Sequence, residues 1–144
     1  MTCTFFGHRD TPDAVRPVLR NALENLITRD GVDDFLVGYQ GNFDRIAVSE
    51  LRKLQKEYPH IRYAVVLASL PQEPLSFDQP TETVYPEGLE TVPPRFAIAR
   101  RNDWMLKQAQ IVITYVTHST GGAATYKAKA EKQKKRIISV VPQQ

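Results

Sequence analysis

Apolar and polar positions along the chain form two alternating patterns, short apolar runs and longer amphipathic segments. The short runs predict strands over residues 2–6, 34–39, 61–67, 111–116 and 136–141. Apolar residues at helical spacing predict helices over residues 12–30, 42–58, 94–109 and 122–135. The run at 61–67 is almost continuously apolar, which is typical of a strand buried on both faces of a parallel sheet.

Three helix details follow from individual residues. Pro17 indicates either a single turn before a helix that begins there or a kink within one helix. Asn42 is expected to be the N-cap of the second helix. The third helical segment is expected to bend near residues 100–102.

Strands that alternate with helices predict the α/β class and right-handed crossovers. We therefore predict a three-layer, Rossmann-like, doubly wound parallel sheet of about five strands. A chain of 144 residues is expected to form one domain, residues 1–144.

Residues 69–94 interrupt this rhythm. They contain six prolines and five acidic residues and have no lysine or arginine. A proline-rich, acidic insertion of this length is expected to be either a lid over the sheet edge or a plain surface insertion.

The composition is that of a water-soluble globular protein, with 42% apolar and 24% charged residues. No segment predicts a signal peptide or a membrane span, so we expect a cytoplasmic protein without a membrane partner. The single cysteine, Cys3, excludes an internal disulfide and is interpreted as a small buried hydrophobe. The three scattered histidines predict no metal site, and neither a phosphate-binding P-loop nor a dinucleotide fingerprint indicates a cofactor.

The net charge of +3 is uneven, because residues 127–136 contain six lysines or arginines and one glutamate. This segment is either a nucleic-acid patch or the solvated, positively charged end of the last helix. No aromatic residues interleave with the lysines, which disfavours single-strand binding. The sequence therefore disfavours nucleic acid as a partner.

Ligands of doubly wound sheets bind outside the carboxyl ends of the strands, where the strand order reverses. This rule selects the loops at 7–10, 38–44 and 117–122 and the start of 68–95. The strand, glycine-rich loop and helix over 111–125 would suit a phosphate, although a Gly-Gly pair is also an ordinary turn. The candidate phosphate ligands in this stretch are Thr117, Ser119, Thr120, Gly121 and Gly122.

In the first loop, Gly7, His8 and Arg9 are candidates. Arg9 can donate two hydrogen bonds to a phosphate, and His8 can do the same or exchange protons. The alternative is that Asp10 pairs with Arg9 while His8 covers the sheet edge.

Further candidates lie in the second loop and the third helix. Gly38 and Gly41 permit positive φ or close approach of a ligand. Asp44 would accept from ribose hydroxyls or favour the helix N-terminus through the dipole. Of two adjacent arginines only one can enter the site, and we choose Arg101, with Asn102, over Arg100.

These motifs resemble the YpsA-like branch of the SLOG superfamily, which is related to the LOG and DprA Rossmann-like domains. The resemblance is carried by the segment Thr4–Arg9, by Arg101-Asn102-x-x-Met105 with Ala109 and Val112, and by Gly121-Gly122-Ala123. It implies a Rossmann-like fold that binds nucleotides or nucleotide-derived ligands.

The LOG enzymes of this superfamily cleave the N-glycosidic bond of nucleoside monophosphates and have the signature Pro-Gly-Gly-x-Gly-Thr-x-x-Glu. This chain retains the signature's glycine pair at Gly121 and Gly122 and its threonine at Thr125. The resemblance therefore implies that Thr125 is a further candidate ligand-binding residue. The position of the catalytic glutamate is Ala128, and Glu131 lies three residues further on.

Three functions follow as hypotheses. The first is a sensor or binding domain for a nucleotide-like small molecule, with its phosphate on residues 117–122. The second is a nucleoside or nucleotide N-glycosidase or transferase that uses Asp44, Glu131 or a carboxylate of the insertion. The third is a nucleic-acid-associated protein that uses the helix at 127–136. A homodimer through Phe96, Ile98 and Trp104 is also expected.

Overall fold

The computed structural model describes residues 1–70 and 81–142. Its strands form one sheet in the order β4-β3-β2-β1-β5-β6, and every paired neighbour is parallel. The strands are β1 (Thr2–Gly7), β2 (Asp34–Val37), β3 (Arg62–Val66), β4 (Glu82–Val84), β5 (Ile111–Tyr115) and β6 (Arg136–Ser139). The predicted α/β, doubly wound parallel architecture is confirmed.

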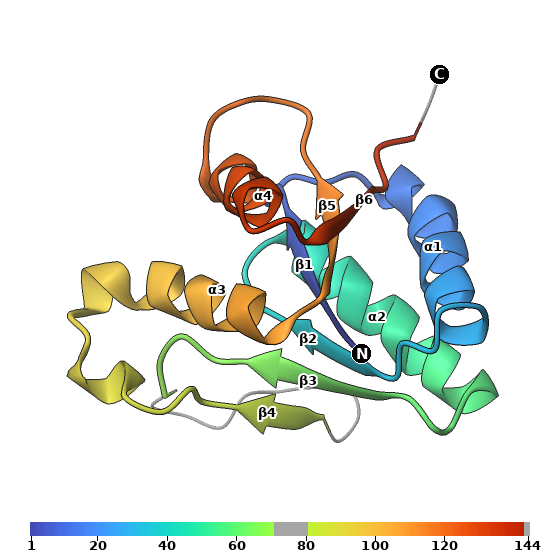
Figure 1. Cartoon of the computed structure of the whole chain (residues 1–144), viewed down its shortest axis with the longest axis horizontal. Coiled ribbons are helices and arrows are strands. Elements are labelled where there is room, and N and C mark those ends of the chain that lie inside the picture. The colour runs from blue at the N-terminus through green and yellow to red at the C-terminus, as the bar shows by residue number, and fades with distance from the viewer. Residues whose placement is uncertain (71–80, 143–144) are drawn as a thin grey trace.

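Two helices cover each face of the sheet, which gives three layers (Figure 1). Helices α1 (Arg16–Thr28) and α2 (Asn42–Glu57) pack on one face. Helices α3 (Ala97–Gln108) and α4 (Gly122–Lys132) pack on the other. None of the helices in the described part of the chain is both long and apolar enough to cross a membrane.

Adjacent residues of the central strand β1 bury their side chains on opposite faces, because side chains alternate along a strand. Phe5 belongs to the core under α1 and α2, where its ring centroid lies 6.4 Å from that of Phe43. Phe6 belongs to the core under α3 and α4, where its ring stacks on Tyr126 at 5.0 Å. The residues that line the end of β1 are thereby fixed by two cores.

The sheet has one strand more than the five expected. Residues of β4 pair with β3 in parallel, with Ala64 opposite Glu82. This strand lies within 69–94, so part of that segment extends the sheet and is not a plain insertion. Residues 71–80 of the expected lid lie outside the described residues.

Prolines set the starts of two helices. Pro17 lies in the first turn of α1, after a 3₁₀ turn at Asp13–Val15, so the prediction of a turn followed by a helix holds and the kink does not. The expected bend at 100–102 is wrong, because α3 runs through these residues unbroken. The break comes earlier, between the 3₁₀ turn Pro94–Phe96 and the start of α3 at Ala97.

Other boundaries also differ from the prediction. Gly41, and not Asn42, is the N-cap of α2. Helix α4 ends at Lys132 because Lys134 takes the left-handed conformation, with φ of 58°. The last strand stops at Ser139.

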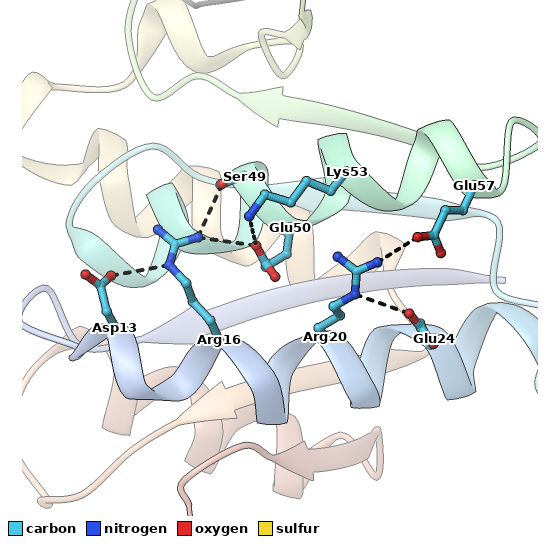
Figure 2. A network of polar contacts seen from close by, with 8 residues as sticks. All are labelled: Asp13, Arg16, Arg20, Glu24, Ser49, Glu50, Lys53 and Glu57. Atoms are coloured by element: carbon cyan, nitrogen blue, oxygen red, sulfur yellow. Dashed lines mark hydrogen bonds and ion pairs between the residues drawn. The ribbon is translucent and has the colours of Figure 1, made fainter.

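Helices α1 and α2 are joined by a network of charged side chains (Figure 2). Glu50 is buried and accepts from Arg16 at 3.3 Å and from Lys53 at 3.1 Å. One turn further along α1, Arg20 donates to Glu57 at 2.9 Å. The pairing satisfies the buried Glu50 carboxylate, which would otherwise destabilise the fold.

Candidate functional site

The strand order reverses between β1 and β5, because the chain proceeds from β1 outward to β4 and then returns to β5 beside β1. The loops that follow these two strands therefore flank the reversal point, as predicted. The backbone N–H of His8 donates to the carbonyl of Tyr115 at 3.3 Å, which holds the first loop beside the end of β5.

Two cavities open at this edge of the sheet and share Arg9, Asp10 and Asp44. The first, which we call the diglycine cavity, has a volume of about 350 Å³. Its lining includes the predicted residues Gly7, His8, Arg9, Asp44, Arg101, Asn102, Thr120, Gly121 and Gly122. The second, the arginine cavity, has a volume of about 990 Å³ and includes the predicted residues Arg9, Gly38, Gly41 and Asp44.

His8 links the two loops of the diglycine cavity. Its ring stacks on that of His118, with centroids 3.8 Å apart and planes 8° from parallel. Its Nε2 accepts a hydrogen bond of 2.9 Å from the backbone N–H of Thr117. Nε2 is therefore unprotonated and the ring is neutral. Burial, and secondarily the nearby His118, lower the pKa of His8, which favours this neutral form.

Arg9 is exposed, and its Asp10 neighbour is exposed as well. No ion pair joins them within the described residues, so the predicted alternative in which Asp10 neutralises Arg9 has no contact to support it. The carbonyl of Arg9 accepts from the N–H of Asn42 at 2.8 Å, which fixes the backbone of Arg9 at the start of α2. The backbone of Arg9 is therefore held in place, and its side chain lines both cavities.

Arg101 lines the diglycine cavity but bonds to protein groups. Only 2% of the residue is exposed. Its guanidinium donates to Asn102 at 2.8 Å, to the carbonyl of Val66 at 3.0 Å and to Gln40 at 2.7 Å. Burial lowers the pKa of Arg101, partly offset by the charge of Asp44. In this structure Arg101 and Asn102 act as a brace between α3, β3 and the second loop.

Asp44 lies between the two cavities. Its Oδ2 accepts from the N–H of Gln40 at 3.0 Å. Desolvation raises the pKa of Asp44 to about 6, although this hydrogen bond and the charges of Arg101 and Arg9 act to lower it. A carboxylate held here changes its charge near neutral pH, which would change the repulsion felt by an anion in either cavity.

Three of the predicted glycines allow close packing of the protein itself. A Cβ on Gly7 would lie 2.2 Å from the ring of Phe43, and one on Gly38 would lie 2.8 Å from Asp44. Gly41 has φ of 90°, and a Cβ there would lie 2.7 Å from the Cα of Arg9. These contacts explain each glycine without a ligand.

The start of α4 is different. Gly121 has φ of 93°, and a Cβ on Gly121 or Gly122 would meet no atom within 4 Å. Both glycines are exposed, and the first amides of a helix have no intrahelical partner. This backbone is open to a close approach from the diglycine cavity.

Other predicted ligands do not line either cavity. Ser119 is exposed but absent from both linings. The N–H of Thr117 is used by His8, and the hydroxyl of Thr125 donates to the carbonyl of Gly121 at 3.0 Å. Thr125 therefore supports the first turn of α4.

Of the carboxylates expected of a glycosidase, Asp44 lines both cavities, whereas the position of the LOG glutamate and Glu131 do not. Ala128 and Glu131 are exposed on α4, and neither lines a cavity. No group of three or more metal-ligating side chains gathers within residues 1–70 and 81–142. The activity and the metal content stay predictions.

Half of the basic residues at 127–136 already have partners. Lys129 pairs with Asp103 at 3.0 Å, and Arg136 pairs with Asp30 at 3.2 Å. Lys135 donates to the carbonyl of Ala109 at 2.7 Å. These contacts favour the interpretation of this segment as the solvated end of a helix.

The search of solved structures finds neighbours of known fold. The DNA processing protein A (DprA) of Streptococcus pneumoniae matches with a TM-score of 0.70 and 13% identity, over 99% of this chain and 50% of that chain. DprA of Helicobacter pylori, described for its single-stranded DNA binding mode, matches with a TM-score of 0.63 and 15% identity, over 100% of this chain and 66% of that chain.

The likeness is one of fold. The chain spans half of the Streptococcus protein and 66% of the Helicobacter protein. No family model and no curated protein matches the chain. The Rossmann-like fold expected from the SLOG resemblance is thus shared with DprA, whereas membership of that superfamily and of its YpsA-like branch stays a prediction.

The comparison corrects the predicted partner. The sequence disfavoured nucleic acid and favoured a nucleotide-like small molecule, and this expectation is wrong by comparison with DprA, since the Helicobacter neighbour binds single-stranded DNA. The prediction relies on the absence of aromatic residues among the lysines of 127–136.

The residues expected to face a partner copy differ in exposure. Phe96 is 50% and Ile98 40% exposed, whereas Trp104 packs against the core between α3 and the sheet. Nothing in the structure tests a homodimer.

Sequence reasoning missed the arginines of the second cavity. Arg45 and Arg52 lie seven residues apart on α2, and both line the arginine cavity. Their helical spacing, directly after a predicted ligand loop, was the available signal.

Proposed function

We propose that the chain binds single-stranded nucleic acid at the diglycine cavity. A backbone phosphate would lie between the guanidinium of Arg9 and the first amides of α4, and a base would stack on the exposed ring of His118. The observation that carries this proposal is the meeting of an exposed arginine, an exposed imidazole and an open helix start at the reversal point of the sheet.

Physical chemistry supports each part of this arrangement. Arginine forms paired hydrogen bonds with phosphate oxygens, and the N-terminal amides of a helix point toward an anion with the dipole in its favour. Bases of any sequence stack on flat side chains. The fold is shared with DprA, one example of which is described as binding single-stranded DNA.

The test is a substitution of Arg9. A fluorescent single-stranded oligonucleotide of mixed sequence is titrated with the wild-type protein and with the Arg9→Ala variant at fixed salt. We expect the variant to bind at least about tenfold more weakly, because it loses a charged hydrogen bond to phosphate.

The control is Arg29→Ala, which removes the same charge from an exposed residue that follows the C-terminal end of α1 and lines neither cavity. Its affinity should stay within about twofold of the wild type, because a distant exposed charge adds little in salt. Equal affinities of the Arg9→Ala and Arg29→Ala variants would show that the strand binds elsewhere. No binding by the wild type would refute the function.

A further inference from the structure

The arginine cavity has no role in the proposed function. It is the larger of the two, at about 990 Å³ against 350 Å³. Both cavities include Arg9, Asp10 and Asp44 in their linings, so they adjoin at these residues. A nucleic-acid strand that leaves the diglycine cavity past Arg9 would therefore enter the arginine cavity.

The charge of this cavity suits an anion. Four arginines line it, Arg9, Arg16, Arg45 and Arg52, against the carboxylates of Asp10 and Asp44. Arg16 is committed to the buried Glu50 and to Asp13, as Figure 2 shows. Arg45 is exposed, and its guanidinium donates to Asn42 of the preceding turn.

The arginines of α2 are arranged along a line. Arg45 and Arg52 are separated by two helical turns, about 10 Å along the axis, with Ser49 between them on the same side. A row of this kind contacts successive phosphates of an extended strand, whereas one small anion can touch only one end of it. Tyr39 adds an aromatic ring to the wall, on which a base can stack.

We propose that the arginine cavity is a second contact site for the same strand, in which Arg45 and Arg52 bind phosphates beyond the one held by Arg9. This inference rests on the proposed function and extends it. The strand would run from the start of α4, past the end of β1, and along the first three turns of α2.

The test separates the two cavities by the length of the strand. Oligonucleotides of about two and about sixteen nucleotides, the longer one within the range of known single-strand sites, are titrated with the wild type and with Arg45→Ala. We expect Arg45→Ala to weaken the longer strand about fivefold or more, while the shorter strand, which reaches only the diglycine cavity, changes less than about twofold. The slope of affinity against salt should fall by about 0.7 for the longer strand, one phosphate contact.

Two comparisons complete the design. Lys56→Ala removes a charge from an exposed residue of the same helix that lines neither cavity, and it should leave both strands unchanged. Arg9→Ala should weaken both strands.

Each outcome decides one proposal. If Arg45→Ala binds both strands as tightly as Lys56→Ala does, while Arg9→Ala binds both more weakly, the second site is wrong and the proposed function stands. If Arg45→Ala weakens both strands equally, the cavities are not separate contact sites. If the wild type binds neither strand, both proposals fail.

Discussion

The Arg101→Met variant is expected to lose about 3 kcal/mol of its free energy of unfolding, as measured by urea denaturation. Methionine keeps most of the buried stem but donates no hydrogen bond. The carbonyl of Val66 and the side chain of Gln40 would lose their donor in a site where only 2% of Arg101 is exposed. Unpaired polar groups at such depth are costly, because water cannot replace the lost donor.

Arg100→Met is the matched control, because Arg100 is the adjacent and exposed residue of α3. Its effect should be within about 0.5 kcal/mol. Equal losses for the two variants would contradict the bracing role of Arg101. A stable Arg101→Met protein that no longer binds oligonucleotide would instead support the ligand role predicted from the sequence.

The pH dependence gives Arg101→Met a second readout. The charge of Arg101 lowers the pKa of Asp44, so its removal raises that pKa above its present value of about 6. A carboxyl whose pKa is raised by folding costs stability as the pH rises from its unfolded to its folded pKa, and the loss is complete above the folded pKa, which is higher in the variant. The stability gap between wild type and variant should therefore widen above pH 6 and narrow below it.

Gly7→Ala is expected to lower the free energy of unfolding by about 2 to 3 kcal/mol. The new Cβ would lie 2.2 Å from Cγ of Phe43, a fully buried ring in the first turn of α2. Either the ring or the end of β1 must move, and both are packed in the core between the sheet and α2. Thermal and urea denaturation measure the loss.

Gly122→Ala tests the same change where the structure has room. Nothing lies within 4 Å of the new Cβ, and alanine favours a helix over glycine. Its stability should be unchanged or higher by less than about 1 kcal/mol. A loss comparable to that of Gly7→Ala would mean that the start of α4 is packed rather than open.

The layers of the fold could be predicted because their signal is local. Each buried strand is an apolar run, and each helix repeats its apolar residues at its own period. Strand β4 gave no such signal, since Glu82 and Thr83 are exposed and the strand is held by backbone pairing to β3. Pairing of this kind depends on a neighbour some twenty residues away and leaves no pattern in three residues.

The edge at which the two cavities open could also be predicted, because parallel topology brings the ends of β1 and β5 together there. The roles of single residues could not. Gly7 is explained by Phe43, and Arg101 by the carbonyl of Val66, and both contacts join segments more than thirty residues apart. A sequence shows that a glycine or an arginine is present near a site but does not show whether it faces the ligand or the core.

The most direct test of nucleic-acid binding at the reversal point of the sheet is a map of the contact on the unmodified protein. Backbone amide chemical shifts of the ¹⁵N-labelled chain are followed as unlabelled single-stranded DNA is added. We predict the largest changes at residues 7–10 and 117–123. Changes concentrated at 127–136, with 7–10 and 117–123 unaffected, would contradict the account.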